Sequence, residues 1–193
     1  MTVYWSISNF HTKIQQFVTI GVFDGVHLGH QHILKQLTNL AKSHNCQSTV
    51  LTFDKNPLEI LNPEKTPQPI TTLQKKIELL RLQKIDNLII ESFSKRFAEI
   101  TAKDFVTEIL VKKINMKGIL VSLDFRFGKD RLGDCNLLTN LAKQHNFTVY
   151  QTGLLKIKGQ IVSSTLVRQL IQNKKYKKAS AFLGWDYETF SNC

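Results

Sequence analysis

The strongest constraint on the fold is one stretch, residues 17–34 (FVTIGVFDGVHLGHQHIL), in which a strand pattern passes through glycines into a helix pattern. The β-branched and aromatic apolar run over residues 17–23 is typical of a buried strand. Apolar residues then recur three and four positions apart over residues 33–40, which marks one face of a helix. The glycines between these two patterns are Gly21, Gly25 and Gly29.

A strand that ends at glycines and leads directly into a helix makes a concave site. The free backbone N–H groups and the positive end of the helix dipole favour a phosphate there. The glycines allow the backbone to approach a ligand closely. His27 and His30 are three residues apart, so both imidazoles should point from one side of the first helical turn. We therefore predict a phosphate-binding turn that carries two histidines.

The spacing excludes two common phosphate-binding motifs. No Gly-Lys-Ser/Thr follows the glycines, as a Walker A loop requires, and the Gly-x-Gly-x-x-Gly spacing of a dinucleotide-binding turn is absent. What remains is His27-Leu28-Gly29-His30, which resembles the His-x-Gly-His signature of the nucleotidyltransferase superfamily. The wider string over residues 21–31, GVFDGVHLGHQ, resembles the opening motif of bacterial FAD synthetase, in its FMN adenylyltransferase module.

Length and composition fit one α/β domain over residues 1–193. The chain is 42% hydrophobic and 21% charged, with no apolar run near the roughly 18 residues of a membrane span and no signal peptide. We therefore expect no membrane association and a cytoplasmic location. The cysteines are scattered and odd in number, which argues against a disulfide framework and against a metal site of zinc type. They are Cys46, Cys135 and Cys193.

The net charge of +11 is compatible with nucleic acid, a membrane surface or an anionic ligand. The densest cluster of lysines lies within residues 174–178, and aromatic residues do not interleave it as an RNA-binding sheet requires. A solvated helix face is the simpler interpretation, so we predict no nucleic-acid partner. The positive field would help to gather ATP.

Strand and helix patterns alternate along the chain, which predicts a parallel sheet with helices on both faces. Residues 54–68 contain three prolines and read as a long irregular loop. Ligands of such sheets bind beyond the carboxyl ends of the strands. This rule should bring together four loops, which follow Ile20, Phe53, Ser122 and Val162.

The string Ser163-Ser164-Thr165-x-x-Arg168 precedes an apolar helix. By itself such a cluster is usually only an N-cap. Arg168, however, should lie one turn into the helix, where it could contact the β- and γ-phosphates and steady the leaving pyrophosphate. The string also resembles the second ATP motif of the family, Ser-Ser-Thr-x-x-Arg.

Two further strings point to a flat aromatic ligand. Asp124-Phe125-Arg126-Phe127-Gly128 is either a loop whose phenylalanines tuck under the sheet edge or an apolar wall for an isoalloxazine ring, with Asp124 as an acceptor. It is similar to the family's Asp/Asn-Phe-x-Phe-Gly element. The string over residues 52–57, TFDKNP, resembles the family's Thr-Phe-Asp-Pro-His-Pro, which lies by the flavin.

The resemblance implies a Rossmann-like nucleotidyltransferase domain that makes FAD and pyrophosphate from FMN and ATP with Mg²⁺. Its catalytic residues would be His27, His30 and Arg168. Its ATP site would comprise Gly21, Phe23, Asp24, Gly25, His27, His30, Ser163, Ser164, Thr165 and Arg168. Its FMN site would comprise Phe53, Asn56, Asp124, Phe125 and Phe127.

The chain departs from the family pattern in three places. Lys55 and Asn56 replace the usual proline and histidine, and Ser122 stands where glycine is common. The chain also ends at Cys193, where the bacterial enzyme usually continues into a riboflavin kinase module, so we expect no riboflavin kinase activity. The alternatives left open are a nucleotidyltransferase with another phosphate acceptor, a flavin- or nucleotide-binding protein without turnover and, more remotely, a basic nucleic-acid-binding module.

Overall fold

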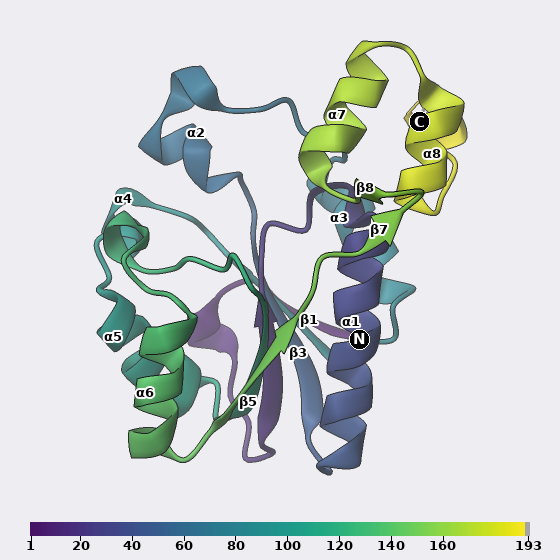
Figure 1. The fold of residues 1–193 in the computed structure, drawn as a ribbon. Helices are drawn as coiled ribbons and strands as arrows, with labels where there is room; N and C mark the ends of the chain where they lie inside the picture. Colours follow the sequence, from purple (N-terminus) through teal and green to yellow (C-terminus); the bar gives the residue numbers. More distant parts are fainter. Residues whose placement is uncertain (192–193) are drawn as a thin grey trace.

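A computed structural model describes residues 1–191, and Cys193 lies outside these described residues. Its centre is a six-stranded parallel sheet with strand order β1-β4-β3-β2-β5-β6 (Figure 1). The strands are β1 (Thr2–Tyr4), β2 (Gln16–Ile20), β3 (Gln47–Phe53), β4 (Asn87–Glu91), β5 (Met116–Ser122) and β6 (Thr148–Thr152). The predicted parallel sheet is confirmed, except that the short edge strand β1 was not anticipated.

Helices cover both faces of the sheet, as the alternating pattern predicted. On one face α1 (Leu28–Ser43) and α3 (Leu73–Arg81) bury leucines and isoleucines against the strands. On the other face the π-helical segment η4 (Phe105–Lys113) and α6 (Cys135–His145) do the same. Each helix presents an apolar stripe, and burial of two such layers against the sheet stabilises the domain.

The remaining elements are short and lie mostly at the edges of this core. They are η1 (Ile7–Asn9), η2 (Asp24–Val26), α2 (Pro57–Leu61), η3 (Pro63–Lys65), α4 (Lys95–Ala98), α5 (Ala102–Asp104), η5 (Lys129–Arg131), β7 (Lys156–Ile157), β8 (Gln160–Ile161), α7 (Ser164–Gln172), α8 (Tyr176–Leu183) and α9 (Tyr187–Ser191).

The three prolines in residues 54–68 predicted a wholly irregular loop, and this prediction was wrong in part. The segment contains α2, whose first turn closes with a capping box: the Asn56 side chain accepts from the Leu58 N–H, and Glu59 accepts from the Asn56 N–H. Pro57 occupies the first helical turn, where its missing N–H costs nothing. The prolines therefore start a short helix instead of preventing one.

The strand order reverses beside β2, because β3 and β4 lie on one side of it and β5 on the other. Ligands of open α/β sheets bind at the carboxyl ends of the strands at such a reversal. Figure 1 shows α2 and the α7–α8 pair beyond this end of the sheet, at the top of the view. One correction applies: Val162 follows the two-stranded β7–β8 hairpin, not a strand of the main sheet.

The C-terminal helices form a small core of their own. Val167 and Leu170 of α7 and Phe182 and Leu183 of α8 pack together, with Ile70 of the loop before α3 against them. This packing holds α7 over the start of α1. Within residues 1–191, no helix combines the length and apolar character needed to cross a bilayer.

The pairing of β2 with β5 makes a specific demand on side-chain size. Gly118 lies opposite Phe17, and a Cβ at Gly118 would come within 2.5 Å of Cε1 of this fully buried ring. We expect Gly118→Ala to lower the free energy of unfolding by about 1–3 kcal/mol through overpacking. Denaturant unfolding measures this, and Gly153→Ala, whose added Cβ meets nothing within 4 Å, is the matched control. Equal stability of the two variants would contradict the close contact between Gly118 and the Phe17 ring.

Candidate active site

The turn after β2 holds an unusual backbone. Phe23, Gly25 and Val26 have φ values of 52°, 78° and 37°. The left-handed region is costly for a β-branched residue, so such a turn persists only where its surroundings fix it. Here the Trp185 indole N–H donates to the Gly25 carbonyl at 2.9 Å, and the Gln31 amide donates to the Val26 carbonyl at 2.9 Å. The turn is thus fixed by groups from two other helical regions.

This turn delivers both histidines to the start of α1. His27 is the N-cap, and its Nδ1 accepts from the His30 backbone N–H at 3.2 Å. The two imidazoles stack with centroids 3.6 Å apart and planes 14° apart, and the Phe23 ring meets His30 edge-on at 5.1 Å. Because Nδ1 of His27 accepts a hydrogen bond, the neutral ring carries its proton on Nε2. The predicted pairing of His27 and His30 is present in the structure.

Both imidazoles are held neutral. Burial lowers the pKa of His27 from 6.5 to about 4, against a smaller opposing effect of Asp24. Burial also lowers the pKa of His30 well below 6.5, and the neighbouring His27, Lys76 and Arg168 add to this effect. Nδ1 of His30 is buried and, within the described residues, has no hydrogen-bond partner. An unpaired buried nitrogen is rare in proteins, and it marks the position where a ligand oxygen is expected.

Asp24 belongs to this turn, and it is buried. Its carboxylate accepts from the Ile70 N–H at 3.0 Å, from the Thr71 N–H at 3.2 Å and from Nη2 of Arg168 at 2.7 Å. The Thr71 hydroxyl also accepts from the Gly25 N–H at 3.2 Å. Asp24 was predicted as an ATP residue, and in the structure its carboxylate serves to join the turn to residues 70–71 and to α7.

The second predicted ATP motif lies against the first. Ser163 caps α7 by accepting from the Leu166 N–H, and the Ser164 hydroxyl donates to the Asp24 carbonyl at 3.1 Å. The Arg168 guanidinium pairs with Asp24 and donates through Nε to the Gln68 carbonyl at 2.9 Å. Thr165 is exposed. The motif is therefore an N-cap that also places Arg168 beside the histidine turn, and the contact of Arg168 with the phosphates stays a prediction.

Lys76 was not among the predicted site residues, but it lies between the histidine turn and the end of β3. Its Nζ donates to the Phe53 carbonyl at 2.7 Å and to the Val22 carbonyl at 3.3 Å, so it bridges the ends of β3 and β2. The sequence signal was available, because Leu73, Lys76, Ile77 and Leu80 follow the i, i+3, i+4, i+7 spacing of an apolar helix face. A lysine on the apolar face of a helix is expected to bury its charge, and Lys76 is buried in the structure.

A cavity of about 220 Å³ opens beside Lys76. The predicted FMN residue Asn56 and the predicted ATP residue Asp24 both line this cavity. The other four predicted FMN residues do not line it. The lining residues are Val22, Asp24, Asp54, Lys55, Asn56, Glu59, Pro67, Pro69, Thr71, Leu73 and Lys76.

The predicted flavin phenylalanines belong to a chain of aromatic rings. Phe53 meets Phe97 with centroids 5.7 Å apart, Phe97 meets Phe105 at 6.1 Å, and Phe105 meets Phe127 at 5.9 Å. Phe125 stacks on Phe127 at 5.4 Å. Phe127 is buried in the core that η4 and α6 form with the sheet, while Phe125 is partly exposed and Asp124 is exposed. The rings thus connect the ends of β3 and β5, and Phe97 and Phe105 were not predicted.

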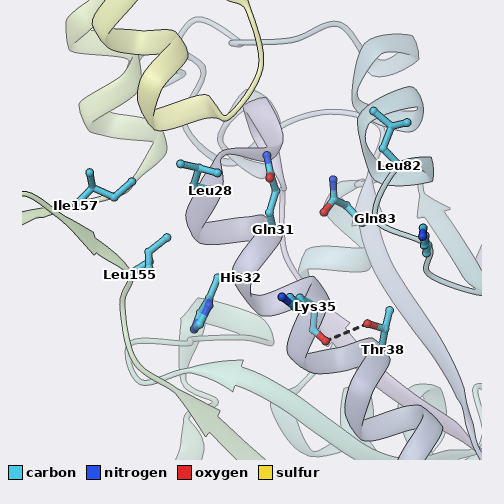
Figure 2. Close-up of a pocket in the computed structure, with 10 residues that line it drawn as sticks. Leu28, Gln31, His32, Lys35, Thr38, Leu82, Gln83, Leu155 and Ile157 are labelled. Carbon is cyan, nitrogen blue, oxygen red and sulfur yellow. Dashed lines mark hydrogen bonds between the residues drawn. The ribbon is translucent and has the colours of Figure 1, made fainter.

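A larger hollow lies elsewhere in the described structure. It measures about 560 Å³ and is bordered by α1, the residues that follow α3, and the β6–β7 segment (Figure 2). None of the predicted site residues lines this hollow, so we do not assign the active site to it although it is larger than the cavity beside Lys76. Its lining residues are Leu28, Gln31, His32, Lys35, Thr38, Leu82, Gln83, Lys84, Leu155 and Ile157.

The sequence matches known proteins over most of its length. The family model for FAD synthetase matches residues 10–166. The bifunctional riboflavin kinase/FMN adenylyltransferase of Buchnera aphidicola subsp. Schizaphis graminum is 39% identical over 168 residues, which are 86% of this chain and 54% of that protein. The Escherichia coli (strain K12) protein of the same name is 35% identical over 86% of this chain and 53% of its own. The chain therefore spans about half the length of these relatives.

Solved structures agree on the fold. A crystal structure titled macrolide-efflux protein from Streptococcus pneumoniae superposes with a TM-score of 0.79 at 24% identity, over 95% of this chain and 61% of that one. Pantoate-beta-alanine ligase from Francisella tularensis superposes with a TM-score of 0.54 at 16% identity, over 94% and 86% of the two chains. At these identities the likeness establishes the α/β fold alone.

The neutral His27 makes stability depend on pH. Its pKa is about 4 in the native state and 6.5 ordinarily, so between these values the unfolded chain binds a proton that the native chain does not. The free energy of unfolding should therefore fall as the pH decreases through this window, and His27 alone should account for about 1–2 kcal/mol of the fall between pH 7 and pH 5. The lowered pKa of His30 adds a contribution of the same sign. Denaturant unfolding at each pH measures it.

His27→Asn is the comparison for this measurement, because the asparagine side-chain oxygen can replace Nδ1 as the capping acceptor and asparagine does not titrate. The variant should lose less stability than the unaltered protein over the same pH range. An identical slope in both proteins would contradict a buried neutral His27.

Proposed function

This chain belongs to the FAD synthetase family, and we propose that it is an FMN adenylyltransferase, which transfers AMP from ATP to FMN and releases pyrophosphate. One observation carries the proposal most of all. A strained turn beyond the sheet reversal presents two stacked, neutral imidazoles at the N-terminus of α1, where backbone N–H groups favour phosphate. The named activity of the relatives requires a site of this kind.

In this reaction an oxygen of the FMN phosphate attacks the α-phosphorus of ATP, the bond from that phosphorus to the bridging oxygen breaks, and pyrophosphate departs. The attacking phosphate is already ionised near neutral pH, so no general base is required. The protein accelerates the step by alignment and by donors aimed at the oxygens that gain charge. Nε2–H of His27 is such a donor, and Nδ1 of the stacked His30, which has no partner within the described residues, is positioned to be a second one.

Arg168 supplies the positive charge for the leaving group. Two of its N–H groups are used by Asp24 and by the Gln68 carbonyl, which fix the guanidinium beside the turn. The others are left for the β- and γ-phosphates of ATP. A guanidinium fixed in this way loses little side-chain freedom when the ligand arrives.

Mg²⁺ enters this reaction as part of the MgATP substrate. Across residues 1–191 there is no group of three or more histidine, cysteine, aspartate or glutamate side chains arranged to hold a metal ion. Mg²⁺ is commonly bound through substrate phosphates and water with few protein ligands.

The test is direct. The protein, FMN, ATP and Mg²⁺ are mixed, and flavin fluorescence is followed, because it falls when adenine stacks on the flavin ring in FAD. Chromatography of the products should show FAD and pyrophosphate in equal amounts. Binding of FMN without FAD formation would contradict the proposal and favour a binding protein, and transfer only to another phosphate would favour a different acceptor.

His30→Ala tests the role of the imidazole in the same assay. We expect kcat to fall by about 100-fold or more, while the dissociation constant of FMN changes by less than about threefold, since the donor acts mainly on the transition state. The matched control is His32→Ala, because His32 is an exposed histidine on the same helix. Equal losses in turnover and in FMN binding would show that His30 only holds the site together.

A further inference from the structure

Lys76 is the one lysine within the described residues whose side chain is buried, with 6% of its surface exposed. We propose that its ammonium binds the phosphate of the acceptor and thereby selects FMN over flavins that lack a phosphate. The inference rests on the proposed function, because it concerns the acceptor of that reaction.

The position of Lys76 is the first support. Its two carbonyl partners belong to the two halves of the site: Val22 to the histidine turn and Phe53 to the predicted flavin side. In the proposed reaction the acceptor phosphate must lie where these halves meet, because it attacks the nucleotide phosphorus while its flavin ring extends away. Lys76 is therefore at the junction that the attacking group has to occupy.

The bonding of Lys76 is the second support. An ammonium carries three N–H donors, and here two of them meet carbonyl oxygens. No carboxylate of the described residues comes within ion-pair distance of Nζ, and burial lowers the pKa of this group. Asp24 and Asp54 act on this ammonium electrostatically without forming an ion pair, and burial outweighs them. An incoming phosphate would supply a counter-charge in direct contact with Nζ.

The cavity beside Lys76 is the third support, because it gives a ligand access to this charge. Three carboxylates also line the cavity, but protein donors occupy them. Asp24 is paired with Arg168, Asp54 accepts from the Ser92 hydroxyl and the Phe93 N–H, and Glu59 closes the capping box of α2. Two lysines line the cavity: Lys55 is exposed, whereas Lys76 is buried and keeps one N–H donor for a ligand.

The test compares FMN with riboflavin, which differ only in the phosphate. Both are titrated into the protein in the presence of α,β-methylene ATP, which fills the nucleotide site without transferring AMP. Lys76→Met should weaken FMN binding by about 10-fold or more, as expected for loss of a charged hydrogen bond, and leave riboflavin binding within about twofold. Lys75→Met removes a neighbouring lysine that is paired with Glu78, and it should change neither.

Several outcomes would overturn the inference. A loss of affinity for both flavins to the same extent would make Lys76 merely structural, and an unchanged preference for FMN would place the phosphate elsewhere. If the unaltered protein makes FAD and either result is found, the inference fails while the proposed function stands. If the unaltered protein binds neither flavin, both fail.

A second measurement needs no variant and covers the case in which Lys76→Met does not fold. A crystal structure of the unaltered protein with FMN should place a phosphate oxygen within about 3.2 Å of Nζ of Lys76. A phosphate more than about 5 Å from Nζ, with no water bridging the two, would overturn the inference.

Discussion

The buried carboxylate of Asp24 is the interaction on which the rest of the site depends. An unpaired buried charge would cost a large part of the stability of a domain, so its partners must be held in place. Those partners come from two separate segments, the backbone of residues 70–71 and Arg168 of α7. Satisfying one charge therefore joins three parts of the chain that lie far apart in the sequence.

The functional features follow from this junction. With α7 held against the turn, Ser164 bonds the Asp24 carbonyl, Trp185 bonds the Gly25 carbonyl, and the unfavourable φ values after β2 are maintained. This turn also fixes the stacked histidines at the N-terminus of α1. The strain is located where a phosphate is expected to bind, which is common for functional turns.

The layered fold was predictable because hydrophobic periodicity reports which face of each element is buried, and the two histidines followed from local spacing. Four features were not predictable in this way. β1 is only three residues long, and Pro57 begins a helix that is closed by the capping box of Asn56 and Glu59. The partners of Asp24 are set by tertiary contacts between residues 46 and 144 positions apart, which local pattern does not report. The sequence showed Lys76 as a lysine on an apolar helix face, but it did not show that the Val22 and Phe53 carbonyls are its partners.

The most direct test of this account is a double-mutant cycle on Asp24 and Arg168, measured as the free energy of unfolding. Asp24→Asn and Arg168→Met should each cost about 2–4 kcal/mol, because each leaves the other charge buried without its partner. The double variant should cost about as much as either single one, which gives a coupling of about 2 kcal/mol or more. Losses that simply add, or single losses below about 0.5 kcal/mol, would show that this ion pair does not hold the site together.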